Sequence, residues 1–197
     1  MSGPPAGTGR HGGRPEGTMM KRGLTILCTL AMLLMAPRGA AAQDARDLAI
    51  ADEVGRVLTS YSRLTIFDDI NATVENGAVV LTGKVTMPYK KDDLADRIAT
   101  IDGVRTFRND VGVLPVSRYD DELRYRVARA IYGNSSFWNY AAMANPPIHI
   151  IVQGGHVTLA GGVNSNVERM LARSLATGHG ELSVTNALRL DGGARTD

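Results

Sequence analysis

The sequence predicts an α+β protein made of two tandem copies of one small domain. The main observation is an internal repeat, because residues 70–85 and residues 148–163 carry the same amino acid at seven matching positions. Each copy also opens with apolar residues at helical spacing and continues with a two-residue turn between alternating apolar residues. These patterns predict the order helix-strand-strand-helix-strand in each copy, with two helices packed on one face of a three-stranded mixed sheet.

The first element of each copy is predicted to be an amphipathic helix. Its apolar residues recur four positions apart, as on one face of a helix. They are Ile50, Val54 and Leu58 in the first copy and Leu123, Val127 and Ile131 in the second. Two acidic residues, Asp120 and Asp121, favour the N-terminal end of the second of these helices, because the helix dipole is positive there.

A β-hairpin follows in each copy. Asn76-Gly77 is a strong signal for a type I′ turn, and Gly154-Gly155 is an acceptable variant. A two-residue turn then pairs the apolar residues that flank it and places them on one face of the sheet. The predicted pairs are Val74 with Val79, Ala72 with Leu81, Val152 with Val157, and Ile150 with Leu159. Gly83 and Gly161 are interpreted as bulge or close-approach glycines.

A second helix and a last strand complete each copy. The helices are marked by Leu94 and Ile98 in the first copy and by Leu171 and Leu175 in the second. The last strands alternate apolar residues with polar ones. Each contains an asparagine on the apolar side, Asn109 or Asn186, which we expect to satisfy backbone groups rather than to perform chemistry.

Residues 1–42 are predicted to be an N-terminal extension followed by a secretory signal peptide. A basic Lys21-Arg22 pair precedes an apolar run at residues 24–35, and three alanines at residues 40–42 supply a cleavage site. The run is short for a membrane span, so cleavage after Ala42 is preferred and an uncleaved anchor is the alternative. The remaining chain divides into domains at 44–115 and 118–192 and a tail at 193–197.

The charge balance changes when the predicted leader is removed. The whole chain has 22 Lys and Arg against 20 Asp and Glu, a net charge of +2. Five of those basic residues and one acidic residue lie in the leader, which leaves 17 against 19 and a net charge of −2. A nucleic-acid-binding protein of this size normally shows a basic excess, so no nucleic-acid partner is predicted. The single cysteine, Cys28, also lies in the leader, which suits an oxidising compartment.

The two copies resemble the BON family (bacterial OsmY and nodulation domain), as a tandem OsmY-like protein. The family pattern of Val-x-Leu-x-Gly-x-Val, then a Gly-Val step and a Val-x-Asn-x-Leu strand, is similar to residues 79–85, 103–104 and 107–111 here. In the second copy it is similar to residues 157–163 and 184–188, although Gly180-Glu181 replaces the Gly-Val step. The resemblance covers nearly all of the chain after the leader.

The resemblance implies a non-enzymatic periplasmic protein that contacts phospholipid and supports envelope integrity or an osmotic-stress response. It implies no catalytic residues and no cofactor. The partners we expect are anionic phospholipid or envelope proteins. After cleavage of the signal peptide we expect the protein to be peripheral to a membrane, such as the outer membrane, and not to span it. The alternative is a soluble periplasmic protein–protein interaction module, or a chaperone-like one, that uses exposed sheet edges for strand addition.

Candidate binding residues lie in an insert that only the second copy has, and in the helix before it. The insert, residues 132–147, holds the only tryptophan of the chain. Its amphipathic cluster, which suits a membrane–water interface or the cap of a core, is Phe137, Trp138, Tyr140 and Met143. The basic candidates on the preceding helix, which suit anionic headgroups or a solvated face, are Arg124, Arg126 and Arg129.

No metal site and no catalytic site is predicted. His149, His156 and His179 are the only histidines after the leader, and no cysteine or carboxylate accompanies them at the spacing of metal ligands. No serine lies in a Gly-x-Ser-x-Gly context, and no carboxylate pair stands out for acid/base chemistry.

Overall fold

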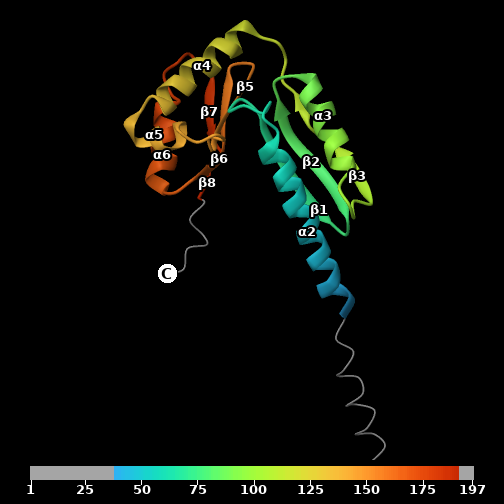
Figure 1. Ribbon diagram of the computed structural model, residues 1–197. Coiled ribbons are helices and arrows are strands. Elements are labelled where there is room, and N and C mark those ends of the chain that lie inside the picture. The colour runs from blue at the N-terminus through green and yellow to red at the C-terminus, as the bar shows by residue number, and fades with distance from the viewer. Residues whose placement is uncertain (1–37, 191–197) are drawn as a thin grey trace, which may run out of the picture. The chain divides into compact units, whose positions relative to one another are not determined.

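Two modules of the same design follow one another along the chain in the computed structural model (Figure 1). The structure describes residues 38–190, with side chains from Ala42 onward, and residues 43–190 belong to one compact unit. The predicted signal peptide, its apolar run and Cys28 therefore lie outside the described residues. Helix α2 begins at Arg38, so the predicted cleavage point after Ala42 falls within this helix.

The first module contains two long helices and a small sheet. Its elements are α2 (Arg38–Ser60), β1 (Asp69–Glu75), β2 (Ala78–Val85), α3 (Pro88–Ala99), β3 (Thr106–Asn109) and β4 (Gly112–Val113). The second module repeats this order and adds the predicted insert. Its elements are α4 (Arg118–Tyr132), the 3-10 turn η1 (Ser135–Phe137), α5 (Trp138–Ala141), β5 (Ile148–Gln153), β6 (His156–Val163), α6 (Asn166–Leu175), β7 (Ser183–Asn186) and β8 (Arg189–Leu190).

The predicted α+β class and hairpin register are confirmed. β1 is antiparallel to β2 with Val74 opposite Val79, and β5 is antiparallel to β6 with Val152 opposite Val157. The sheet differs from the prediction in one respect, because the last strand of each module is broken in two. β3 and β4 both run parallel to β2, and β7 and β8 both run parallel to β6, so each mixed sheet has four strands.

An asparagine lies at the break in the last strand of each module. Asn109 donates from Nδ2 to the carbonyl oxygen of Lys91 at 3.0 Å and accepts from the N–H of Val111 at 3.2 Å. Asn186 donates in the same way to the carbonyl oxygen of Arg169 at 2.8 Å. The side chain thus links the strand to the second helix where the backbone leaves the ladder, as expected for a group that satisfies the backbone.

Each module has its own aliphatic core beneath its two long helices. The first is formed by fully buried residues from the middle strand and from α3, namely Val79, Leu81, Val85, Leu94 and Ile98. The second gathers buried residues from α4, β5 and β6, including Leu123, Val127, Ile131, Ile150 and Leu159. It also contains two residues of the insert, which enlarge it relative to the first core.

The predicted turn and close-approach glycines have unusual backbone geometry. Asn76 and Gly77 have φ of 53° and 73°, and Gly154 and Gly155 have φ of 60° and 77°, as a type I′ turn requires. At Gly83 a Cβ would lie 2.0 Å from the carbonyl oxygen of Asp69, and at Gly161 the corresponding contact would be 1.9 Å. Only glycine fits where two strands approach this closely.

The loop before β1 contacts the second module. The carbonyl oxygen of Ile66 accepts a hydrogen bond from the N–H of Ile150 at 2.7 Å. Ile66 and Phe67 also pack against the second core, and the Phe67 ring meets Tyr125 edge-on at a centroid distance of 5.2 Å. One side of β5 is therefore supported by a loop that belongs to the first repeat.

Candidate functional site

The aromatic cluster of the insert divides between the core and the surface. Phe137 is fully buried and Tyr140 is 6% exposed, with the Tyr140 hydroxyl donating to Glu168 Oε2 at 2.7 Å. Trp138 and Met143 are 63% and 48% exposed. Phe137 and Tyr140 are three residues apart, so they share the inner face of these short helical turns, whereas Trp138 lies on the outer face. Only Trp138 and Met143 are left to contact a ligand or membrane.

The three arginines of α4 divide in the same way. Arg124 is 4% exposed, donates from a guanidinium nitrogen to the carbonyl oxygen of Val152 at 2.7 Å, and pairs with Asp121. Its guanidinium therefore supports β5 and is removed from the candidate contact surface. Arg126 and Arg129 are exposed and form no ion pair with a residue that the structure describes.

A carboxylate on the first helix of each module binds the amides of the hairpin turn. Asp120 accepts from the N–H groups of Gly154 and Gly155, both at 2.8 Å. Asp47 accepts from the N–H groups of Asn76 and Gly77 at 2.6 and 2.9 Å. Desolvation raises the pKa of Asp47, but these hydrogen bonds outweigh it and hold the pKa below its usual value. Sequence reasoning missed this role, although each aspartate lies three residues before the first buried apolar residue of its helix.

A buried ion pair joins the loop and α3 of the first module. Lys90 is 3% exposed and donates to Asp68 Oδ2 at 2.6 Å. Asp68 also accepts from the backbone N–H and the hydroxyl of both Thr65 and Thr86, at 2.7 to 2.9 Å. Burial raises the pKa of Asp68, but Lys90 and these donors outweigh it, so the net pKa lies below the usual value. All polar atoms of this pair are engaged, which indicates a structural role.

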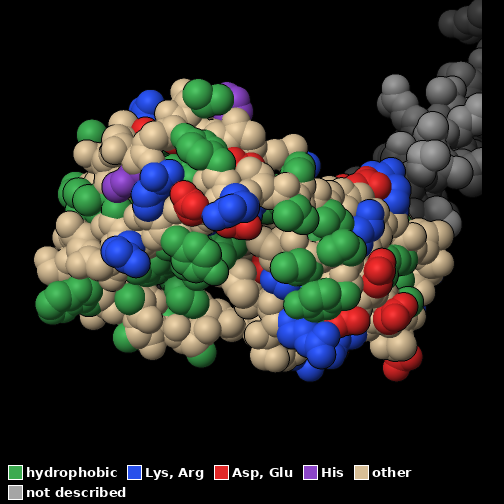
Figure 2. Space-filling view, turned by 90° about the horizontal axis from the view of Figure 1, so that it is seen from above, with side chains coloured by type: hydrophobic (Ala, Val, Ile, Leu, Met, Phe, Trp, Pro, Cys, Tyr) green, Lys and Arg blue, Asp and Glu red, His purple; other side chains and the backbone are tan. Residues whose placement is uncertain are grey.

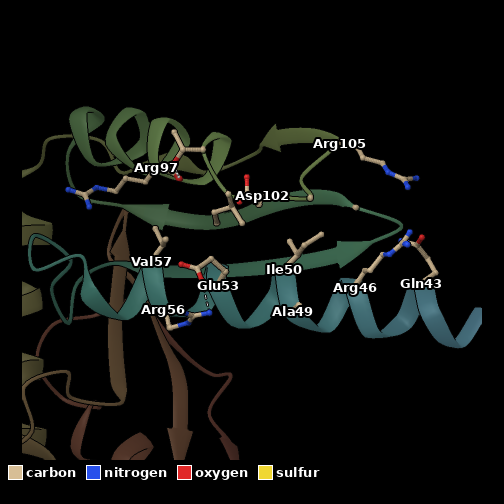
Figure 3. Close-up of a pocket in the computed structure, with 14 residues that line it drawn as sticks. Gln43, Arg46, Ala49, Ile50, Glu53, Arg56, Val57, Arg97, Asp102 and Arg105 are labelled. Atoms are coloured by element: carbon tan, nitrogen blue, oxygen red, sulfur yellow. Dashed lines mark hydrogen bonds and ion pairs between the residues drawn. The ribbon is translucent and has the colours of Figure 1, made fainter.

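A groove of about 840 Å³ lies between α2 and the turn that follows α3 (Figure 3). Apolar side chains line part of its wall. They are Ala49, Ile50, Val57 and Ile101. Four arginines surround them against two carboxylates, which are Arg46, Arg56, Arg97 and Arg105 against Glu53 and Asp102. We call this feature the arginine groove.

The four arginines of the arginine groove are not equally engaged. Arg56 pairs with Glu53 at 2.5 Å, and the guanidinium of Arg97 lies 5.0 Å above the ring of Tyr61. Arg46 and Arg105 form no ion pair with any described residue. Figure 3 shows them extending from facing elements at the same end of the groove, beside Gln43, with Arg97 at the other end.

The corresponding positions in the second module carry uncharged side chains. Tyr119 occupies the repeat position of Arg46, and its hydroxyl donates to the carbonyl oxygen of Gly180. Leu182 occupies the repeat position of Arg105 and packs with Tyr119 beside Gly155. Two large uncharged side chains thus stand where the first module has two unpaired cations. Comparing the two copies at these positions is the sequence signal that would have located the groove.

The charged side chains form local groups. On the face shown in Figure 2, Lys and Arg lie in separate groups with Asp and Glu beside them and apolar side chains between. Within residues 38–190 no three His, Cys, Asp or Glu side chains gather in a way that could hold a metal ion. Over the same residues, no helix is both long and apolar enough to span a bilayer.

Comparisons with known proteins give a family but no curated relative. No curated protein sequence matches the chain. Two solved structures of CdsD, a structural protein of the type III secretion system of Chlamydia trachomatis, are similar to it. The C-terminal domain is 15% identical, with a TM-score of 0.27, over 71% of this chain and 66% of that one. The second is 14% identical, with a TM-score of 0.26, over 72% and 92%. The BON domain model matches residues 46–115 and again residues 120–192, so the chain belongs to the BON domain family as a tandem member.

Proposed function

We propose that this protein is a non-catalytic envelope protein that contacts anionic phospholipid through its second module, in support of envelope integrity or the response to osmotic stress. The proposed compartment is the periplasm, reached through the predicted signal peptide. The observation that carries the proposal is the exposure of Trp138, the only tryptophan, at 63%. Aromatic rings with a polar edge favour the membrane–water interface over bulk water.

The remaining contact residues supply an apolar and a cationic component. Met143 adds a half-exposed apolar side chain to the same insert, and Arg126 and Arg129 add unpaired charge on the helix that leads into it. Each basic residue near an anionic surface contributes about 1 kcal/mol. This contribution is local, since the chain after the leader is slightly acidic, and it is screened by salt over about 10 Å at 0.1 M.

Vesicle binding tests the proposal, with Trp138 as an intrinsic probe. We expect the fluorescence maximum of Trp138 to shift to the blue with vesicles that contain phosphatidylglycerol and to stay unchanged with phosphatidylcholine alone. Replacing Arg126 and Arg129 with Gln removes about 2 kcal/mol, so the affinity should fall by about 30-fold. Leu48→Ala, at a 66% exposed apolar residue of the other module, is the control for Trp138→Ala in co-sedimentation.

The outcome separates the two functions that the sequence leaves open. Absence of binding at low salt would overturn the lipid proposal. Crosslinking to envelope proteins in that case would favour the protein–protein alternative. Within the described residues, β3 and β7 each pair with a neighbouring strand on one side only, so the other side of each could accept a strand from a partner.

A further inference from the structure

We propose that the arginine groove of the first module is a binding site for a phosphate group carried on a small organic body. It lies in the module that the membrane proposal does not use, and it does not depend on that proposal. The phosphate would sit between Arg46 and Arg105, and the organic body along the apolar wall of Ile50 and Ile101.

The first argument concerns the two unpaired guanidinium groups. They extend from facing elements toward the same end of the groove, where each could offer two N–H donors to one phosphate (Figure 3). The planar fork of arginine matches phosphate oxygens better than the point charge of lysine does. Two like charges gathered at one end of a groove repel each other, and a bound anion would relieve that repulsion.

The second argument concerns the nearby carboxylates, none of which forms an ion pair with Arg46 or Arg105 among the described residues. Glu53 is paired with Arg56. Asp47, whose charge faces Arg105, is engaged by the amides of the hairpin turn and by Gln43. Asp102 lines the groove and would repel an anion beside it, which favours the Arg46 and Arg105 end over the middle.

The third argument is the comparison between the modules. The second module has Tyr119 and Leu182 at these positions, so the fold does not require cations there. The first module keeps an open hollow with two cations that form no ion pair with a described residue. A bound phosphate would occupy this space and pair with both cations.

The experiment is a phosphate titration of the full chain followed by NMR, at constant ionic strength with chloride as the reference anion. Inorganic phosphate should give saturable shifts in the backbone amides of residues 101–105, and glycerol 3-phosphate should bind several-fold more tightly because its carbon body reaches the apolar wall. Replacing Arg46 and Arg105 with Gln should weaken binding at least tenfold. Arg108→Gln, at an exposed arginine of the same module that pairs with Asp110, is the control and should leave the affinity unchanged.

A second variant tests whether the loss of binding is due to misfolding. A second experiment with vesicles distinguishes a lipid headgroup from a free phosphate compound. Arg46→Tyr combined with Arg105→Leu gives the first module the residues that the second module has at these positions. Because the second module folds with them, this variant should keep the fold and abolish binding. Vesicles with phosphatidic acid are tested on the Trp138→Ala chain, which removes the contact proposed for the second module. Binding there that depends on Arg46 and Arg105 assigns a lipid headgroup, and binding of glycerol 3-phosphate alone assigns a free ligand. Absence of saturable binding in both arms, or equal binding by the Gln variants, overturns the proposal.

Discussion

The buried pair of Asp68 and Lys90 gives a stability prediction of defined size. Lys90→Met keeps the length and the apolar stem of the side chain and removes only its charge. Asp68 would then remain buried without a cation, at 2% exposure, while retaining its four hydrogen bonds from Thr65 and Thr86. Breaking a buried pair in this way typically costs 3–5 kcal/mol, because an uncompensated charge stays in the interior.

The retained hydrogen bonds place the expected loss at the lower end of that range, at about 3 kcal/mol. Two of the four donors are backbone N–H groups of Thr65 and Thr86, which the substitution does not move. Asp68→Asn, alone and combined with Lys90→Met, removes the carboxylate charge and turns one of its two acceptor oxygens into a donor. The free energies of the four proteins form a double-mutant cycle that isolates the coupling between the two side chains.

The pair also sets an acid dependence. The folded-state pKa of Asp68 lies below its unfolded value, so the carboxylate contributes stability that is fully present above the unfolded pKa of about 3.9. That contribution is lost as the pH falls through the folded pKa. Without Lys90 the folded pKa rises and its distance from the unfolded pKa shrinks, so the acid-induced loss of stability from this carboxylate should be smaller in Lys90→Met.

Urea unfolding followed by circular dichroism at neutral and acidic pH measures both effects. The CD signal reports both modules, whereas Trp138 fluorescence reports only the second and serves to separate the transitions. Lys91→Met, at the next residue of the same helix and outside every described ion pair, is the control and should cost less than 1 kcal/mol. A loss of less than 1 kcal/mol in Lys90→Met, or an equal loss in the control, would refute the reasoning.

Three further predictions concern single residues. Gly161→Ala places a Cβ 1.9 Å from a backbone carbonyl oxygen and should cost several kcal/mol in urea unfolding, whereas Gly154→Ala, with positive φ but open space around it, should cost about 1–2 kcal/mol. Asp120→Asn turns one acceptor of the turn amides into a donor, so we expect a loss of about 2 kcal/mol, and an unchanged midpoint would contradict the described clamp. Burial, together with the hydrogen bond to Asp93, raises the pKa of Tyr61 to about 12, so its ultraviolet titration should lag behind exposed tyrosines and stability should fall between about pH 10 and 12.

The repeat made most of the fold predictable from sequence. Each hairpin has a turn signal and flanking apolar residues that agree on one register, and the second copy checks the first. The break in the last strand was not predictable from alternation, because Asn109 fits the period of a strand while its side chain binds the backbone of α3. Local pattern specifies the side of the sheet, and only tertiary contacts specify where a strand leaves its partner.

The binding residues were less predictable for two physical reasons. Composition marks Phe137, Trp138 and Tyr140 alike as interface residues, but the phase of two short helical turns buries the first and third. Arg124 is similar: its position on α4 faces β5, where Val152 offers a carbonyl acceptor. The arginine groove is a space left between α2 and the turn after α3. The residue pattern of one copy alone does not show whether such a space is left open or occupied by side chains.

Because a loop of the first repeat contacts β5, the second sequence repeat and the segment that folds as a unit have different boundaries. A chain that begins at residue 118 contains every residue of the second sequence copy but lacks Ile66 and Phe67. The N–H of Ile150 would then face solvent on a bare strand edge, next to uncovered apolar surface. Such an edge is a template for pairing with another molecule. The isolated second copy should therefore self-associate through β5, and a truncation that extends back to residue 61 should stay monomeric.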